Sequence, residues 1–435
     1  MDNILIGLEA GLRDNWPGTE VRRLRSHARQ APDWLPAACD VDTSDLKQLQ
    51  DTAVTLARQG TTIVAGTTEQ LYRLINQSVG TAGPLFDVIV LDEAGQLDVA
   101  HALLVLAGAA PEASLVVAGD PRQLPPIHAA DPPAGLEPLV GSVYGFFRNW
   151  HQIPDNPLTV NYRSNSDIVA LARRAGYPSD LTAYHPGLRL RYAPETAGDA
   201  ARPPEWPAGL PFSADLADIA RPDRPVVCLT YPEGVSGQWN QFEADTVAAL
   251  VWWYSARLAD GLDGQASPAG QAPSAAALVQ PEQLWKRIGV VTPHRAQRAR
   301  VIDRLAGVFA TPGAAPDTPA WIAGAVDTVE RFQGQERDVI IASYAVGDPD
   351  TVAEEAEFLH DMNRFNVLAT RAKAKLIVIA SRELVAHISG DLQVIRSSEL
   401  LKDFVDTFCS SSRPATLDWV DTGRSRPVEV ELRWH

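Results

Sequence analysis

The stretch PLFDVIVLDEA, residues 84–94, decides the fold class of this sequence of 435 residues. Its apolar run VIVL predicts a buried β-strand, and the strand ends in two carboxylates, Asp92 and Glu93. TTIVAG (61–66) before it and ASLVVAGD (113–120) after it predict two more strands, with amphipathic stretches between them that predict helices. This alternation indicates an α/β fold with a parallel sheet and helices on both of its faces.

The same alternation returns in the second half of the chain. It starts with RPVVCLTY (224–231) and the amphipathic stretch 240–258, and it continues from RIGVVTP (287–293) to KAKLIVIAS (373–381). We therefore expect a second α/β domain over residues 224–395.

Less regular segments set the expected domain boundaries. Residues 196–223 are rich in Pro, Ala, Gly and Arg and predict a linker after a first domain of residues 1–195. Residues 260–283 are of low complexity and predict a mobile surface loop within the second domain. Residues 396–435 show no clear period beyond one helix, so we expect a helix and a tail there.

Composition narrows the class of protein. No run of about 18 or more apolar residues is free of charge, so we expect no membrane-spanning helix, and the first residues lack the pattern of a secretory signal. The three cysteines are far apart and fit neither a metal site nor a disulfide framework, as in cytoplasmic proteins. With a net charge of −16, any path for nucleic acid must be a local groove, because the overall field repels phosphates.

Asp92 and Glu93 stand at the carboxyl end of a predicted strand, which is where ligands bind in open parallel sheets. One carboxylate there can hold Mg²⁺ through water, and its neighbour can take a proton from an attacking water. Ordinary surface acids at a strand end are the alternative, and for this pair alone they are the more common explanation. A second strand end, GDPRQLPPI (119–127), favours the first interpretation, because Leu-Pro-Pro stiffens the chain after Gln123 and a rigid amide beside a γ-phosphate can orient water.

Two arginines lie next to predicted helices. Arg163 precedes the helix in LTVNYRSNSDIVALAR, and Arg371 ends the helix in NRFNVLATRAKAK. A planar guanidinium suits the spread charge of a phosphoryl group in transfer. Each arginine alone is equally well explained by a solvated helix face, so position by itself does not decide the role of either.

A polar loop connects two predicted strands in VDTVERFQGQERDVIIASY (326–344). Gly334 permits a positive φ or a close approach of the backbone. Glu336 could accept hydrogen bonds from a ribose, and Thr328 could bond a phosphate of a nucleic acid. A plain polar connection between strands is the alternative.

Six segments of the chain, in this order, resemble motifs II to VI of superfamily 1 helicases. They are FDVIVLDEAGQ, GDPRQLPPI, LTVNYRS, IGVVTPHRAQ, VDTVERFQGQERDVII and NVLATRAKAKLIVI. The resemblance covers roughly residues 60–130, 157–175 and 225–382, and it is greatest to the 5′-to-3′ branch that includes the nonsense-mediated-decay RNA helicase and the Okazaki-fragment helicase-nuclease. It implies two RecA-like parallel-sheet domains in tandem, ATP and Mg²⁺ as cofactors, and ATP hydrolysis coupled to movement on single-stranded DNA or RNA.

The resemblance also implies a role for each matching residue. Asp92 would hold the water shell of Mg²⁺, Glu93 would be the general base, and Gln123 would sense the γ-phosphate. Arg163 and Arg371 would be the arginine fingers.

Other matching positions would contact the nucleotide or the nucleic acid. Gln333, Gly334 and Glu336 would contact the nucleotide. The expected nucleic-acid contacts are Thr67, Thr68, Thr292, Pro293, His294 and Thr328. The sequence departs from the family at His294, where tyrosine is common, and at Gly95, where alanine is frequent.

One motif of the family is absent from these residues. Its phosphate loop, GxxxxGK followed by Ser or Thr, wraps the phosphates with backbone N–H groups and a lysine, but the sequence contains no Gly-Lys dipeptide. The opening MDNILIGLEAGL resembles the helix after motif Ia, so we expect the first domain to be incomplete at its N-terminus. Three explanations stay open: an upstream segment encodes the loop, which we favour; a separate chain supplies it; or the chain is a degenerate nucleic-acid or partner-binding module without ATPase activity.

Overall fold

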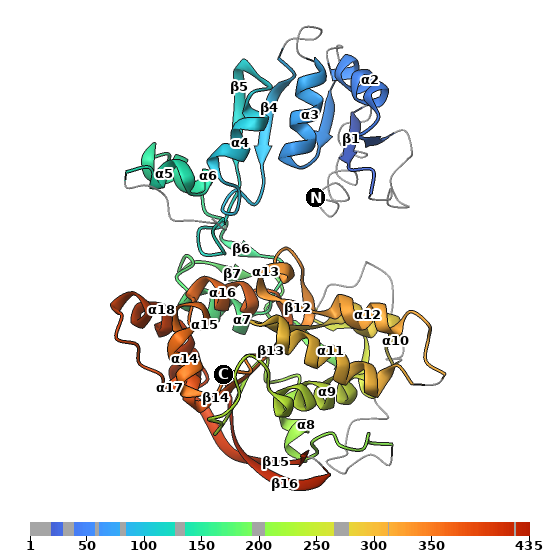
Figure 1. Cartoon of the computed structure of the whole chain (residues 1–435), viewed down its shortest axis with the longest axis vertical. Helices are drawn as coiled ribbons and strands as arrows, with labels where there is room; N and C mark the ends of the chain where they lie inside the picture. Colours follow the sequence, from blue (N-terminus) through green and yellow to red (C-terminus); the bar gives the residue numbers. More distant parts are fainter. Residues whose placement is uncertain are drawn as a thin grey trace. The chain divides into compact units, whose positions relative to one another are not determined.

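The structure, a computed structural model, describes residues 19–28, 39–56, 61–78, 84–126, 135–193, 205–264, 278–311, 313–421 and 423–435. Its internal contacts divide the chain into two compact units, which we name unit 1 (Met1–Asp155) and unit 2 (Asn156–His435) (Figure 1). Within the described ranges, every helix is too short or too polar to traverse a lipid bilayer.

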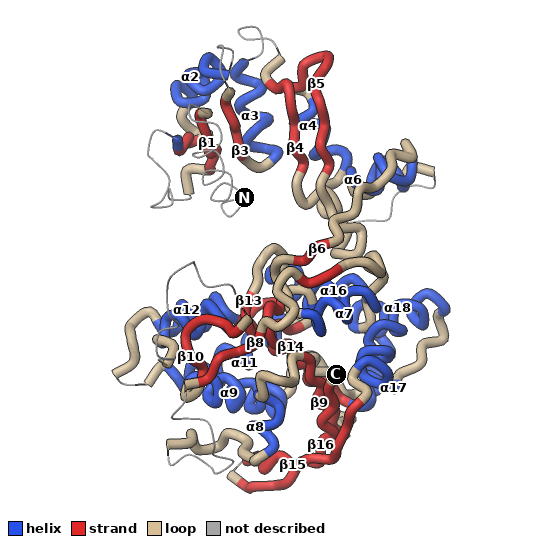
Figure 2. Tube along the Cα trace, turned by 180° about the vertical axis from the view of Figure 1, so that it is seen from behind, coloured by secondary structure: helices blue, strands red, loops and turns tan. Residues whose placement is uncertain are grey.

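Unit 1 contains two small parallel sheets. The first has the strand order β2-β1-β3, and its members are β1 (Glu20–Arg25), β2 (Asp40–Asp42) and β3 (Thr62–Ala65). Helices α2 (Leu46–Leu56) and α3 (Thr68–Ser78) pack on it through a core that includes Leu24, Leu49 and Leu74. Figure 2 shows β3 next to the strands of the second sheet.

The second sheet of unit 1 pairs β4 (Phe86–Leu91) with β5 (Ala109–Val117), joined by helix α4 (Val99–Leu106). The strands run parallel with Leu91 opposite Val117, so their carboxyl ends lie side by side. Short helices α5 (Glu137–Val140), α6 (Val143–Gly145) and the π-helical turn η2 (Phe146–Trp150) follow.

The two faces of β4 differ in burial. Ile89 and Leu91 pack into a core with α4, whereas Val88 and Val90 on the other face are 59% and 62% exposed. Val116 of β5 is also exposed. An apolar face of this sheet is therefore without cover in the described part of unit 1.

Unit 2 is built on a seven-stranded sheet of order β12-β11-β13-β14-β9-β16-β15. Its strands are β9 (Val226–Tyr231), β11 (Ile288–Thr292), β12 (Val326–Thr328), β13 (Arg337–Ser343), β14 (Ala372–Ser381), β15 (Ser411–Asp421) and β16 (Arg424–Trp434). The first five in sheet order are parallel, and β16 and β15 are antiparallel. Two tandem units with parallel strands and crossover helices confirm the predicted α/β class.

Helices and short strands complete unit 2. The helices are α7 (Ser166–Arg174), α8 (Asp215–Ala220), α9 (Gln241–Ser255), α10 (Pro281–Arg287), α11 (Arg295–Phe309), α12 (Thr318–Ala325), α13 (Val329–Phe332), α14 (Pro349–Glu354), α15 (Ala356–Leu359), α16 (Met362–Ala369), α17 (Arg382–Ala386), α18 (Leu392–Asp403) and the π-helical turn η4 (Phe404–Phe408). The short strands are β6 (Val160–Asn161), β7 (Thr182–Ala183), β8 (Arg189–Tyr192) and β10 (Leu258–Asp263).

The boundary between the units falls before the segment that carries Arg163, not at residue 195 as the sequence suggested. The side chain of Ser164 donates to the carbonyl of Ala372 at 2.7 Å, and Asn165 Nδ2 donates to that of Ala374 at 3.0 Å. These hydrogen bonds to β14 attach the segment to unit 2, and neither could be read from local sequence.

The expected linker and tail also differ from the structure. The described part of 196–223 contributes Trp206, Leu210 and Leu216 to the core of unit 2, because apolar residues lie between its prolines. Residues 396–435 include the β15–β16 hairpin, which extends the sheet beyond β9. Of the expected loop 260–283, residues 265–277 lie outside the described residues.

Removing a core contact of this hairpin tests its place in unit 2. Leu432 is 0% exposed and Leu392, at the start of α18, is 71% exposed. We expect Leu432→Ala to lower the free energy of unfolding by about 2–5 kcal/mol and Leu392→Ala to leave it nearly unchanged. Chemical denaturation measures both, and equal stabilities would show that the hairpin is not part of the core.

Candidate functional site

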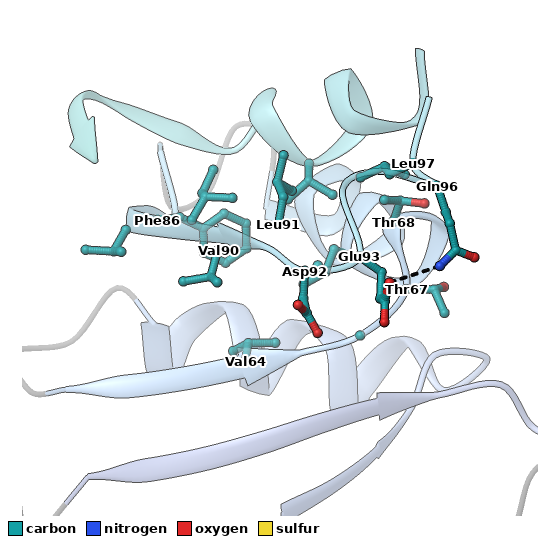
Figure 3. A pocket seen from close by; sticks show the side chains of 15 residues that line it. Val64, Thr67, Thr68, Phe86, Val90, Leu91, Asp92, Glu93, Gln96 and Leu97 are labelled. Carbon is teal, nitrogen blue, oxygen red and sulfur yellow. Dashed lines mark hydrogen bonds between the residues drawn. The ribbon is translucent and has the colours of Figure 1, made fainter. Parts of the chain in front are cut away.

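A pocket of about 370 Å³ in unit 1 runs along β4, where Val88 and Val90 line it, to the polar residues at the ends of β3 and β4 (Figure 3). Asp92 and Glu93, directly after β4, line it with exposed side chains, and Gln96 Nε2 donates a hydrogen bond to Glu93 Oε2 at 3.0 Å. Thr67 and Thr68, at the start of α3, line the same pocket. The structure thus brings these predicted nucleic-acid contacts beside the predicted catalytic carboxylates.

The backbone of Glu93 is strained. Its φ is 52°, in the left-handed region, and its carbonyl accepts a hydrogen bond from the N–H of Gln96 at 2.8 Å in a tight turn. A residue with a Cβ costs roughly 1–2 kcal/mol there, and such strain is concentrated at functional sites. The turn aims the Glu93 side chain into the pocket, so the strain accompanies a specific placement of a carboxylate (Figure 3).

The loops after β4 and β5 pack against each other through two glycines. A Cβ on Gly95 would lie 2.8 Å from the carbonyl oxygen of Asp120, and a Cβ on Gly119 would lie 2.7 Å from the nitrogen of Gly95. Glycine at 95, rather than the alanine frequent in the family, therefore matches the close approach of the backbones. In the second loop Gln123 Nε2 donates to Asp120 Oδ2 at 2.9 Å, so Asp120 orients the predicted sensor amide.

The carboxylates fit one type of metal binding. Across the described ranges no group of three or more His, Cys, Asp or Glu side chains could hold a metal ion. Mg²⁺ usually keeps several waters and needs only one or two carboxylates together with substrate phosphates. Asp92 and Glu93, two exposed acids at a strand end, therefore suit a Mg²⁺ ion shared with phosphates and not a site made of protein ligands alone.

A second pocket, of about 580 Å³, lies within unit 2 and brings together residues far apart in sequence. Arg163 Nε donates to Glu336 Oε2 at 2.6 Å, and Lys373 Nζ lies 2.6 Å from Glu336 Oε1. Partial burial raises the pKa of Glu336, but hydrogen bonds from Lys373 and Arg163 outweigh it, and the pKa lies below its ordinary value. The pocket wall thus holds one carboxylate between two cations.

Arg371 is buried and does not line this pocket. Its Nε donates to the carbonyl of Val367 at 3.0 Å and its Nη2 to Thr370 Oγ1 at 3.2 Å, at the end of α16. Arg163 Nη1 donates to the carbonyl of Thr370 at 3.1 Å. Both predicted arginine fingers therefore bind Thr370, and of the two only Arg163 lines the pocket.

Two residues of this pocket, Tyr162 and Lys373, were not predicted from the sequence. Tyr162, next to Arg163, is 68% exposed, and its ring centre lies 4.6 Å from that of Tyr184. Lys373 supplies the second cation. An aromatic residue directly before a candidate arginine was a usable signal for Tyr162, since an exposed ring offers a stacking surface. Lys373 had no comparable local signal, because its partner is distant in sequence.

Gly334, in the loop that precedes Glu336, has a φ of 77°, a conformation that the sequence analysis allowed for glycine. Gln333 lies at the end of α13 beside it. This loop leads directly to Glu336, which binds Arg163 and Lys373.

The predicted nucleic-acid contacts of unit 2 meet at the carboxyl ends of β11 and β12. Thr292 and Thr328 are opposite each other in the parallel pairing, and Pro293 and His294 follow β11. All four are buried. Thr292 Oγ1 donates to the carbonyl of His294 at 2.8 Å, so its hydroxyl is engaged within the turn.

Buried His294 pairs with the half-buried carboxylate of Glu355. Its Nε2 lies 2.9 Å from Glu355 Oε2, and its ring packs on Phe358. Burial lowers the pKa of His294 below its ordinary value, although Glu355 acts in the opposite direction. The histidine found where the family has tyrosine is thus held inside the turn by a carboxylate.

Comparisons with known proteins cover both units. A family model described as an AAA domain matches residues 145–383, and a second model with the same description matches residues 21–140. The chain is 26% identical over 303 residues to the DNA replication ATP-dependent helicase/nuclease DNA2 of Xenopus laevis, covering 68% of this chain and 25% of the relative. It is 28% identical over 297 residues to DNA2 of Mus musculus, with the same two coverages.

An RNA helicase is also similar. Mov10l1 of Mus musculus is 26% identical over 347 residues, which cover 73% of this chain and 25% of that protein. The chain thus spans about a quarter of the length of these curated relatives.

Two substitutions at one position separate backbone strain from loss of charge. Glu93→Ala and Glu93→Gly both remove the carboxylate, but only glycine relieves a φ of 52°. We expect the glycine variant to be more stable by about 1 kcal/mol. Hydrogen exchange of the β4 amides measures this difference, and equal protection in the two variants would contradict strain at Glu93.

Proposed function

We propose that this chain, which belongs to the AAA-domain family of superfamily 1 helicases, couples ATP hydrolysis to movement along single-stranded nucleic acid. One observation carries the proposal: parallel pairing of β4 and β5 sets Asp92 and Glu93 beside the loop that holds Gln123. That arrangement joins an acid for Mg²⁺, a base for water and a rigid amide at one sheet edge.

In unit 1 each of these residues has a task in the proposed hydrolysis. Asp92 would hold a hydrated Mg²⁺, which would neutralise charge on the phosphates. Glu93 accepts a proton from the attacking water, and its strained backbone supports a defined position for that step. Gln123, oriented by Asp120, aligns the water with its amide.

Unit 2 has a pocket of its own whose groups suit a nucleotide. The exposed ring of Tyr162 offers a stacking surface for a base, and Glu336 offers acceptor oxygens for ribose hydroxyls. Arg163 and Lys373 are the cations for phosphate charge, and Arg371 supports Arg163 through Thr370. Arg371 would have to leave the carbonyl of Val367 and the hydroxyl of Thr370 to act as a second finger, so we assign it a positioning role.

Each unit has one short segment that we assign to contact with the nucleic acid. Thr67 and Thr68 of unit 1 begin a helix, and the segment from Thr292 to His294 precedes α11 in unit 2. Helix N-termini and hydroxyls bind the phosphate backbone without reading bases. This type of contact is compatible with the net charge of −16, because it does not need a broad basic surface.

The phosphate loop that the proposal needs is not encoded in these 435 residues. The exposed apolar face of Val88, Val90 and Val116 supports a place for it, since a strand and helix packed there would bury this face. We propose that an upstream segment of a longer chain, or a separate chain, supplies the loop. The second candidate function, a nucleic-acid-binding module without ATPase activity, rests on the same missing Gly-Lys pair.

The catalytic assignment is tested in a polypeptide that also carries a phosphate loop. We expect Glu93→Gln to lower nucleic-acid-stimulated ATP hydrolysis by about 10²–10⁴-fold, because the general base is lost, while binding of single strands persists. Glu112→Gln, an exposed acid on β5, should hydrolyse ATP as the parent does. Undiminished hydrolysis in Glu93→Gln would refute the assignment.

The binding half of the proposal is tested with the 435-residue chain itself. We expect it to bind single-stranded DNA and RNA of one sequence with an affinity that falls as salt rises, because phosphate contacts release counterions. Fluorescence anisotropy measures both ligands. Absence of binding to either at low salt would refute a nucleic-acid path on this chain.

A further inference from the structure

A buried carboxylate outside every motif considered above lies at the start of α9. Glu243 is 0% exposed, and it accepts hydrogen bonds from the Tyr231 hydroxyl at 2.7 Å, Ser343 Oγ at 2.6 Å and the Ala345 N–H at 2.9 Å. A buried acid is costly unless such bonds satisfy it. These three donors come from the ends of β9 and β13, so one side chain joins two strands and a helix.

The cluster continues to α11. Asn240, the N-cap of α9, accepts from the Glu243 N–H at 3.0 Å and donates from Nδ2 to the Tyr231 hydroxyl at 3.0 Å. Gln297 of α11 accepts from the Asn240 N–H at 2.8 Å and donates to Ser343 Oγ at 2.8 Å. Helices α9 and α11 are therefore tied to the same strand end by buried polar bonds.

Glu243 also holds a strained turn. Ala345 has a φ of 68°, and its N–H is the one bound by Glu243. Beyond it, the N–H groups of Gly347 and Asp348 donate to the carbonyl of Ser236 at 2.8 and 2.9 Å. These two hydrogen bonds join the loop after β13 to the loop after β9. The Glu243 carboxylate fixes Ala345, near the start of the first of these loops.

These loops lead directly to the predicted nucleic-acid segment. Gln238 Nε2 donates to Glu355 Oε1 at 2.7 Å, and Glu355 Oε2 lies 2.9 Å from His294 Nε2. Helix α11, held by Gln297, begins immediately after His294. The Glu243 cluster is therefore linked to this segment by two indirect routes, through Gln297 of α11 and through the loop that carries Gln238, whose partner Glu355 lies beside His294.

We propose that Glu243 is the positioning residue of the nucleic-acid segment of unit 2, setting the place of Thr292–His294 through Gln297 and through the loops after β9 and β13. The inference rests on the proposed function, since it assumes that this segment contacts nucleic acid. Glu243 does not touch the ligand and acts through the residues it holds.

The charge state of Glu243 distinguishes positioning from simple packing. Burial raises the pKa of Glu243 to about 7, although the bonds from Ser343, Tyr231 and Ala345 lower it, and nearby Glu233 raises it further. The other titratable group that acts on this cluster is Glu383, which raises the pKa of Tyr231. Protonation turns one carboxyl oxygen of Glu243 from an acceptor into an O–H donor, although three donors point at this carboxyl. The hydrogen bonds that Glu243 accepts from Tyr231, Ser343 and Ala345 therefore weaken as the pH falls below about 7.

Stability and binding should then change with pH in opposite directions. The folded-state pKa of Glu243 lies above its ordinary value of 4.5, so its contribution to the free energy of unfolding is present at low pH and is lost as the pH rises through about 7. Affinity for nucleic acid should instead increase as the pH rises through the same range. A residue that only packs the core would not separate the two.

The test measures affinity for an oligothymidylate, whose bases do not titrate near neutral pH, from pH 6 to pH 8. We expect the parent chain to bind roughly fivefold more tightly at the upper end, equivalent to about one hydrogen bond, and Glu243→Gln to bind weakly with a flat profile. Asp245→Asn is the matched control, because Asp245 is buried on the same helix but pairs with Arg304 and Trp419 Nε1. The affinity of Asp245→Asn should change with pH as steeply as that of the parent chain.

A second variant guards against misfolding of Glu243→Gln. Ser343→Ala removes one donor to the carboxylate, so the binding midpoint should move to higher pH. The thermal unfolding temperature should fall, because Ser343 also accepts from Gln297, and circular dichroism checks that the variant is folded at the assay temperature. An unchanged midpoint in Ser343→Ala, or loss of the slope in Asp245→Asn, overturns the inference and leaves the proposed function standing. No binding by the parent at any pH overturns both.

Discussion

Parallel strand pairing is the constraint on which both units depend. Parallel strands end at the same edge of a sheet, so every loop that follows a strand is delivered to one side. In unit 1 this rule sets the Asp92–Glu93 turn against the Gly119–Gln123 loop, and two glycines allow the backbones to touch. In unit 2 it sets Thr292 opposite Thr328 and brings the ends of β9 and β13 onto Glu243.

The carboxylates at the two candidate sites differ in their exposure and in their partners. The carboxylates of unit 1 are exposed at the pocket, where a hydrated cation and phosphates can reach them. In unit 2 the two acids at the predicted binding segments each have a basic partner. Glu336 lies between Arg163 and Lys373, and Glu355 lies beside His294. This pairing holds Arg163 and Lys373 on one carboxylate in the wall of the unit 2 pocket.

Prediction from the sequence succeeded where the signal was local. Alternating apolar runs and amphipathic stretches predicted the α/β class and the strands that carry Asp92, Gln123 and Thr292, and glycine at 334 matched a positive φ. The prediction of an irregular tail was wrong for residues 411–434, which form two strands. Val428, Val430 and Leu432 alternate with polar residues there, as an antiparallel strand requires. Both a periodicity of two and a turn signal, Gly423 between the strands, were present there, and the prediction missed them.

Sequence alone determined which chemistry this chain carries: the Asp-Glu pair after an apolar strand, the proline-stiffened glutamine, the ordered motifs of a helicase family and the missing Gly-Lys pair are all local facts of the chain. Only the tertiary structure decided how those residues act together. It attached Arg163 to unit 2, buried Arg371 behind it, paired Glu336 with Lys373 and gathered Glu243, Ser343 and Gln297 into one cluster. The physical reason is distance along the chain: hydrogen bonds and ion pairs between residues many positions apart depend on sheet order and register, which no single segment encodes.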